Sequence, residues 1–175
     1  MAMVADQQSY GFKDKLREGE AGELFIADNL SRYGTVHPVA SMGFQKVGID
    51  AFLVSERYGY TSMQFKRCEK AQRYGNGFIE VAILDENKQK KDLGWALKTT
   101  AQHVAYWAVG MRKILLMDTM GIKRRLPEWQ SKYRTGLGVS FENGRTWYGE
   151  GICVPLLILI DEVCTDVLTV EEPTR

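Results

Sequence analysis

The sequence is short of the residues that mark several classes of protein. Its 175 residues include only three cysteines and two histidines, and 23 Lys and Arg nearly balance 22 Asp and Glu. Cys68, Cys153 and Cys164 are odd in number and lack metal-ligand spacing, so we expect reduced thiols and a cytoplasmic protein. His37 and His103 are far apart in sequence, which argues against a zinc site or a catalytic triad. A net charge of +1 excludes a general basic coat, so any affinity for nucleic acid must come from local patches.

Long hydrophobic runs are also absent. Residues 152–160 are too few to cross a bilayer and are interrupted by Pro155, so we interpret them as a buried strand. The N-terminus lacks a basic region followed by an apolar stretch, and we expect neither a signal peptide nor a membrane partner. The chain is 45% hydrophobic and 26% charged, which suits one substantial core. We therefore expect a flexible extension at residues 1–12 and a single domain over residues 13–175.

Two short runs of β-forming residues contain the most informative side chains. Residues 47–54 and 60–66 are separated by turn residues, which predicts an antiparallel hairpin. Opposing residues in such a hairpin have a constant index sum, so Asp50 is expected to lie across from Gln64 to Lys66. Because side chains alternate faces along a strand, Gln64 and Lys66 share one face. The sequence therefore predicts an acid, an amide and a lysine close together.

A further acid lies on a preceding helix. The apolar residues between Lys15 and Tyr33 have helical spacing and form one broad arc: Leu16, Leu24, Ile26, Ala27, Leu30 and Tyr33. Glu23 lies near the middle of this arc, with Glu20 one turn earlier, whereas Phe25 lies on the opposite face. A carboxylate that faces the core is costly unless it is paired, hydrogen-bonded or bound to a metal. We therefore expect Glu23 to point inward as a functional acid.

These segments resemble the PD-(D/E)XK nuclease superfamily, which includes restriction enzymes, archaeal-type Holliday junction resolvases and some homing endonucleases. The resemblance rests on residues 19–24 (GEAGEL), 48–50 (GID) and 63–66 (MQFK), whose order and spacing agree with the family. It extends less specifically to a strand at residues 77–83 and a hairpin at residues 103–118. It implies an α/β fold of the restriction-endonuclease-like type, with a mixed β-sheet flanked by helices. By analogy it also implies a homodimer that cuts two DNA strands with two sites.

The resemblance also implies roles for the site residues. Asp50 would be the metal-binding acid, Gln64 stands where most members have Glu or Asp, Lys66 would be the catalytic lysine, and Glu23 the helix-borne acid. Asp50 and the backbone carbonyl of Phe65 would hold Mg²⁺, with Mn²⁺ as a substitute, while Gln64 and Glu23 complete its shell. Hydrolysis of a phosphodiester needs neutralised phosphate charge, a hydroxide near neutral pH and a stabilised leaving oxygen. The implied function is a metal-dependent DNA endonuclease.

Gln64 leaves an alternative open. An amide oxygen is a neutral ligand, so Gln in place of a carboxylate weakens Mg²⁺ binding unless Glu23 restores the charge. Some branches of the superfamily have Gln-x-Lys and remain active. The alternative is a catalytically silent nuclease-fold module that binds DNA or a protein partner, and a third hypothesis is a small α/β binding protein unrelated to nucleic acid.

Three basic clusters are candidate DNA contacts. The first follows the Gln-x-Lys motif and so lies beside the predicted site. The second, residues 88–91, is interpreted as a solvated face, and for the third, residues 123–125, solvation at a helix start and phosphate contact are equally supported. The DNA-binding candidates from the first and third clusters are Arg67, Lys70, Arg73, Lys123, Arg124 and Arg125.

The remaining segments have weaker signals. We expect a strand at residues 35–40, a short helix around residues 93–97 that Gly94 weakens, and a helix from about Pro127 to Tyr133. The glycine-rich residues 136–151 predict a loop that tracks DNA or contacts a second subunit. The spacing of Trp129, Tyr133 and Trp147 is compatible with base stacking but is more typical of a core.

Overall fold

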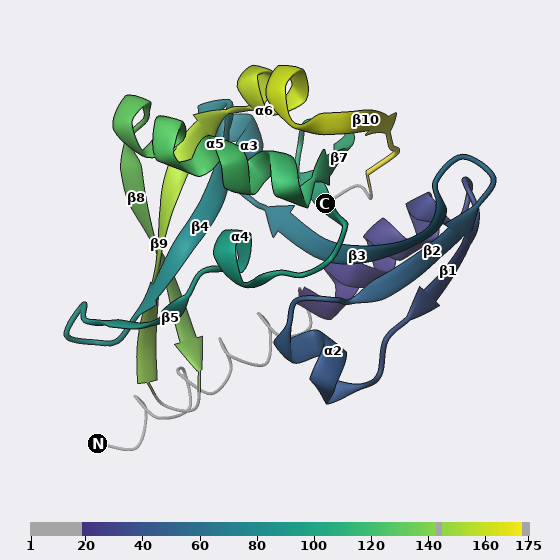
Figure 1. Cartoon of the computed structure of the whole chain (residues 1–175). Coiled ribbons are helices and arrows are strands. Elements are labelled where there is room, and N and C mark those ends of the chain that lie inside the picture. The colour runs from purple at the N-terminus through teal and green to yellow at the C-terminus, as the bar shows by residue number, and fades with distance from the viewer. Residues whose placement is uncertain (1–18, 143–144, 173–175) are drawn as a thin grey trace, which may run out of the picture.

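Two β-sheets organise the part of the chain that the computed structural model describes, residues 19–142 and 145–172 (Figure 1). The larger sheet has six strands in the order β1-β2-β3-β6-β7-β10. These strands are β1 (Thr35–Pro38), β2 (Ala51–Ser55), β3 (Gly59–Cys68), β6 (His103–Ala108), β7 (Lys113–Asp118) and β10 (Cys164–Thr169). Neighbouring strands are antiparallel except β3 and β6, which are parallel. The larger sheet is therefore mixed, and the predicted hairpins β2–β3 and β6–β7 are confirmed.

The smaller sheet has four antiparallel strands in the order β5-β4-β9-β8. These strands are β4 (Asn76–Leu84), β5 (Lys90–Leu93), β8 (Thr135–Glu142) and β9 (Arg145–Pro155). The strand predicted at residues 77–83 is confirmed as part of β4. The loop predicted at residues 136–151 is wrong, because these residues lie mostly in the β8–β9 hairpin.

Six helices accompany the sheets in the described residues, and together they make a single mixed α/β domain. The first covers residues 19–30 in the described part of the chain. The others are α2 (Met42–Lys46), α3 (Ala71–Tyr74), α4 (Trp95–Lys98), α5 (Thr119–Lys132) and α6 (Leu156–Glu162). The described helices include none that is long and apolar enough to cross a membrane. The N-terminal extension predicted at residues 1–12 lies outside the described residues.

Two helix boundaries correct the sequence predictions. The start near Pro127 is wrong, since α5 begins at Thr119, where Asp118 Oδ2 accepts a hydrogen bond from the backbone amide of Gly121 at 2.6 Å. This is an N-cap, which satisfies an amide that the helix itself cannot. The strand predicted over residues 152–160 is wrong after Pro155, where β9 ends and α6 begins.

The larger sheet is buried on both faces, and this arrangement defines two hydrophobic clusters. On one face the helix of residues 19–30 packs Ile26 and Leu30 against Leu53, Met63 and Trp107. The opposite face packs against the smaller sheet, α5 and α6, and its fully buried side chains include Tyr106, Met117, Trp129, Ile79, Ile152 and Leu159. A sheet covered on both faces positions loops and strand ends rigidly, which suits a functional site.

The helical wheel predicted for the first helix is wrong in part. Ile26 and Leu30 are buried as expected, but Leu24 is 71% exposed. Phe25, which the wheel placed on the opposite face, stacks on Trp107 with ring centroids 4.1 Å apart. Asn29 is buried too, and its side-chain amide donates to the backbone carbonyl of Phe25 at 2.9 Å. The buried stripe is therefore narrower than the predicted arc and is turned away from Leu24.

The C-terminal segment is tied to the β6–β7 turn by the carboxylate of Glu172. It accepts hydrogen bonds from the indole Nε1 of Trp107 (3.0 Å) and from the backbone amides of Gly110 (2.8 Å) and Arg112 (3.1 Å). Glu172→Ala leaves these three donors without their acceptor and is expected to lower the free energy of unfolding by about 1 to 3 kcal/mol. Urea denaturation measures this loss. Glu171→Ala, at the exposed neighbouring position, is the control, and equal losses for the two variants would contradict the assigned role.

Candidate active site

The β2–β3 hairpin brings the predicted residues together. Ala51 pairs with Met63 in a register whose index sum is constant, so Asp50, one residue before β2, lies opposite Gln64. Met63 belongs to the cluster beneath the helix of residues 19–30, whereas Cys68 belongs to the cluster beneath the smaller sheet. Gln64 and Lys66 have the parity of Cys68, so both project toward the side of the larger sheet where the smaller sheet packs.

Asp50 is held at both backbone groups and at its carboxylate. Its amide donates to the Met63 carbonyl, and its carbonyl accepts from the Val39 amide, both at 2.9 Å. Its Oδ2 accepts from the backbone amide of Phe65 at 2.7 Å. The Oδ1 atom accepts no hydrogen bond from the described residues. The Asp50 carboxylate is therefore fixed through Oδ2, and its Oδ1 remains available to a ligand.

The hydrogen bond from Phe65 to Asp50 also orients the Phe65 carbonyl. In a β-strand the N–H and C=O groups of one residue point toward the same neighbouring strand. Because the Phe65 amide points toward Asp50, its carbonyl points to that edge as well. The predicted pairing of this carbonyl with the Asp50 carboxylate is geometrically possible.

Gln64 is a buried amide with an unsatisfied oxygen. The residue is 5% exposed, and its Oε1 has no hydrogen-bond partner among the described residues. A buried polar atom without a partner costs about 1 to 3 kcal/mol, so such atoms are uncommon unless a ligand or water completes them. The site thus contains an oxygen that is ready to accept a donor or a cation.

Gly48 shapes the wall beside Gln64. It has a φ angle of +73°, and a Cβ atom there would lie 2.9 Å from Gln64 Nε2 and 3.0 Å from Thr99 Cα. Thr99 is fully buried and donates its Oγ1–H to the Gly48 carbonyl at 2.9 Å. Lys123, on α5, in turn donates Nζ to the Thr99 carbonyl at 2.7 Å. A glycine is therefore required here by both the backbone angle and the close approach.

Lys66 is half-buried and makes no ion pair within 4 Å to any described residue. Burial raises the pKa values of two carboxyl groups from other elements, Glu23 and Glu80, and the positive charge of Lys66 acts against this rise in both. The Lys66 ammonium is therefore within electrostatic range of acids from two other elements, but it forms an ion pair with neither. Such a lysine can interact with a phosphate or a water molecule.

Glu23 is near the site, although the prediction that it points into the core is wrong. The side chain is exposed, at the edge of the helix rather than on its buried stripe. Partial loss of hydration raises the pKa of Glu23, the charge of Asp50 raises it further, Lys66 lowers it, and Glu20 raises it. Glu23 therefore lies within electrostatic range of Asp50 and Lys66, and a nearby cation would favour its ionised form.

Glu80, on β4, is a site residue that sequence analysis missed. Burial raises the pKa of Glu80, while a hydrogen bond from the Trp95 amide (3.4 Å) and the charge of Lys66 act in the opposite direction. Its Oε2 occupies the space that a Cβ atom on Gly149 would take. The sequence offered only an alternating apolar strand around Glu80, because its proximity to Lys66 depends on how the two sheets pack.

The chemistry of the predicted donor set suits a hard divalent cation. Asp50, the Gln64 amide oxygen, the Phe65 carbonyl and Glu23 offer only oxygen atoms, which are the ligands that Mg²⁺ prefers. The unsatisfied Gln64 Oε1 is the observation that favours this fit. Within the described ranges, no three His, Cys, Asp or Glu side chains form a group that could hold a metal ion. The set instead contains two acids, one amide and one backbone oxygen.

The six predicted DNA-binding residues lie in different environments. Arg67 lies on the opposite face of β3 from Lys66, paired with Glu69 at 2.6 Å and 5.2 Å from the Trp107 ring. Lys70 and Arg73 are exposed beyond the end of β3. The cluster at residues 123–125 lies inside α5 rather than at a helix start: Arg124 is 3.5 Å from Asp118, and Arg125 pairs with Glu128 at 2.9 Å. Of these residues, Lys123 is connected to the site through Thr99.

The other side chains considered as functional have structural contacts. His103 Nδ1 lies 3.2 Å from Thr61 Oγ1, and Cys68 is buried. Trp129 is fully buried and donates Nε1–H to Glu162 at 2.9 Å, which confirms a core role.

Comparisons with protein-family models, curated proteins and solved structures find no match to this chain.

Proposed function

We propose that this protein is a metal-dependent DNA endonuclease that hydrolyses phosphodiester bonds, built on a restriction-endonuclease-like fold. The observation that carries the proposal is the arrangement of Asp50 beside Gln64, whose buried oxygen has no partner in the described chain. Lys66 lies on the same face of β3 as Gln64 and interacts electrostatically with Glu23 and Glu80. The mixed sheet and its β2–β3 hairpin are consistent with this fold.

The residues of the candidate site have separate roles in the proposed hydrolysis. Asp50 and the Phe65 carbonyl would hold Mg²⁺ at one edge of the hairpin, Gln64 would complete the ligand set from the strand face, and Glu23 would add a second negative charge. Mg²⁺ bound there would supply charge neutralisation at the phosphate and a more acidic water. Lys66 stabilises the developing phosphate charge or orients the attacking water, since it is not engaged in an ion pair with the described residues.

Cleavage assays test this proposal directly. Supercoiled plasmid, duplex, branched and single-stranded DNA are incubated with the protein and Mg²⁺ or Mn²⁺, with EDTA as a blank. We expect Asp50→Asn and Lys66→Ala to reduce the cleavage rate by roughly 100-fold or more, the range for losing a metal ligand or an acid–base group. Asp161→Asn and Lys132→Ala, both at exposed positions, are the matched controls and should retain wild-type rates. Cleavage that survives both site substitutions would remove these residues from the mechanism.

A catalytically silent DNA- or protein-binding module is the second candidate, and the neutral side chain of Gln64 favours it. With Gln64 in place of a carboxylate, the predicted metal-binding set has one negative charge fewer than an all-acid set. Calorimetric titration with Mn²⁺ distinguishes the two functions. A nuclease binds the ion through Asp50 and loses that binding on Asp50→Asn, whereas a silent module shows no binding in either form.

A further inference from the structure

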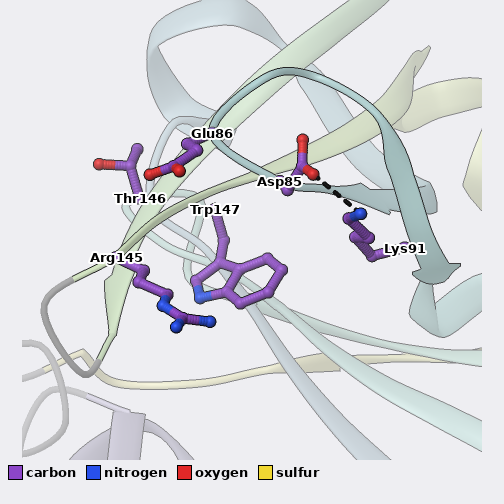
Figure 2. A pocket seen from close by; sticks show the side chains of 6 residues that line it. All are labelled: Asp85, Glu86, Lys91, Arg145, Thr146 and Trp147. Atoms are coloured by element: carbon purple, nitrogen blue, oxygen red, sulfur yellow. Dashed lines mark ion pairs between the residues drawn. The ribbon is translucent and has the colours of Figure 1, made fainter.

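A second site lies at one end of the smaller sheet. The β4–β5 turn, β5 and the start of β9 surround a pocket of about 320 Å³, lined by Asp85, Glu86, Lys91, Arg145, Thr146 and Trp147 (Figure 2). This volume lies at the lower end of the range for small-ligand pockets, roughly 300 to 1,000 Å³. Figure 2 shows the indole of Trp147 between the side chains of Arg145 and Lys91.

Two of the four charged side chains in this pocket are already engaged. Asp85 Oδ1 accepts from the backbone amides of Asn87 and Gln89, each at 2.9 Å, and its Oδ2 pairs with Lys91 at 3.1 Å. Asp85 and Lys91 therefore hold the turn and neutralise each other. Arg145 and Glu86 are exposed and make no ion pair within the described part of the chain. Within the described residues, the pocket thus offers a guanidinium and a carboxylate without an ion-pair partner, together with an indole.

Trp147 differs from the other three tryptophans. Trp95, Trp107 and Trp129 are 9%, 5% and 0% exposed, whereas Trp147 is only half-buried. Its side chain is therefore less covered than those of the three core tryptophans. Its indole face is instead available inside a pocket, beside a cation that has no partner in the described chain.

The pocket lies on the same face of the smaller sheet as Glu80. Side chains alternate along β9, so Arg145 and Trp147 share a face with Gly149, whose Cβ position is taken by the Glu80 carboxylate. Glu80 lies within electrostatic range of Lys66, so this face of the smaller sheet extends toward the proposed catalytic lysine. Trp147 lies two residues from Gly149, or about 7 Å along the strand.

An unpaired nucleotide matches these groups. An indole stacks on any exposed base, a guanidinium binds a phosphate, and a carboxylate accepts a hydrogen bond from a base amino group. A base inside an intact duplex is stacked between its neighbours and cannot enter such a pocket without being extruded. The chemistry therefore favours a strand that is already unpaired.

We propose that Trp147, Arg145 and Glu86 bind an unpaired nucleotide of the substrate, so that the enzyme acts where duplex DNA meets a single strand. This inference rests on the proposed endonuclease function. The unpaired base stacks on Trp147, and its phosphate pairs with Arg145. The adjoining strand then follows the smaller sheet past Gly149 toward Lys66.

Binding without cleavage tests the inference. Fluorescence anisotropy in EDTA compares the full-length protein on a forked DNA and on a blunt duplex of the same sequence. We expect the fork to bind roughly tenfold tighter, and Trp147→Ala to remove this preference, because base stacking on an aromatic side chain contributes on the order of five- to 100-fold in affinity. Trp147→Phe keeps a stacking face and should preserve the preference. Arg145→Ala should weaken fork binding and reduce its salt dependence, whereas Arg32→Ala, at another exposed arginine, should not.

Two results would overturn the inference: equal affinity for fork and duplex, or a fork preference that Trp147→Ala leaves intact while thermal denaturation shows a folded variant. The proposed function is judged separately, by plasmid cleavage in Mg²⁺. A chain that binds forks through Trp147 but never cleaves DNA loses only the nuclease assignment. A chain that cleaves DNA but is indifferent to Trp147 and Arg145 loses only this pocket.

Discussion

Gly48→Ala is expected to lower the free energy of unfolding by about 2 to 5 kcal/mol and to disrupt the candidate site at the same time. A left-handed backbone angle costs a side-chain-bearing residue about 1 to 2 kcal/mol. Crowding in a packed interior adds about 1 to 3 kcal/mol. The new methyl group would press on Gln64 Nε2 and on the backbone of Thr99, and Thr99 is fully buried and hydrogen-bonded to Gly48. Urea denaturation measures the stability, and Mn²⁺ titration measures the site.

Gly59→Ala separates the two causes of this loss. Gly59 has a φ angle of +64°, close to that of Gly48, but nothing lies within 4 Å of the Cβ position there. The substitution should cost only the backbone term, about 1 to 2 kcal/mol, and leave any metal response unchanged. If the two alanine variants are equally destabilised, Gly48 does not pack against Gln64 and Thr99 as described.

The β2–β3 hairpin was predictable because its geometry is local. A short turn fixes the register of two antiparallel strands, so the separation of Asp50 and Gln64 in sequence determines that they face each other. The same holds for the β6–β7 hairpin. Both predictions depend on residues fewer than 20 positions apart, and neither requires knowledge of how layers pack.

Elements that depend on packing were predicted less well. The wheel for the first helix gave equal weight to all apolar residues, but Gly22 and Asn29 are buried while Leu24 is exposed. Gly22 permits close approach to Arg67, and the side-chain NH₂ of Asn29 donates to the helix backbone. The wrong prediction that Glu23 faces the core followed from this error. Its proximity to Asp50 and Lys66 comes from the edge of the helix rather than from its buried face.

Glycine and proline were misread in the C-terminal half for related reasons. Glycines typical of a loop lie in β8 and β9 because the Phe78 ring packs over Gly136, Gly138 and Gly151. Pro127 lies inside α5, while the true start depends on the Asp118 cap. An apolar run of nine residues does not distinguish a strand from a helix, and residues 152–160 contain parts of both. Glu80 was missed because β4 belongs to a second sheet.

Gln64→Glu is the substitution with the largest expected effect on the candidate metal site. A carboxylate at a position that is 5% exposed, close to Asp50, is expected to lower the free energy of unfolding in EDTA by at least about 2 kcal/mol. In Mg²⁺ the added charge becomes a ligand, and we expect affinity for the ion to rise by about tenfold or more. Thermal denaturation across a Mg²⁺ titration reads both effects, because a ligand stabilises only the state that binds it.

The sign of the metal effect separates the two candidate functions. In a nuclease site, Mg²⁺ should reverse the destabilisation of Gln64→Glu and shift its denaturation temperature more than that of the wild type. In a silent module the buried carboxylate has no cation to pair with, so Mg²⁺ would leave the variant as unstable as in EDTA. Gln130→Glu, on the exposed side of α5, adds the same charge without a site and should respond to Mg²⁺ like the wild type. Gln64 is the candidate site residue that departs from the motif of the resembled superfamily, so restoring a carboxylate there tests the proposed nuclease function.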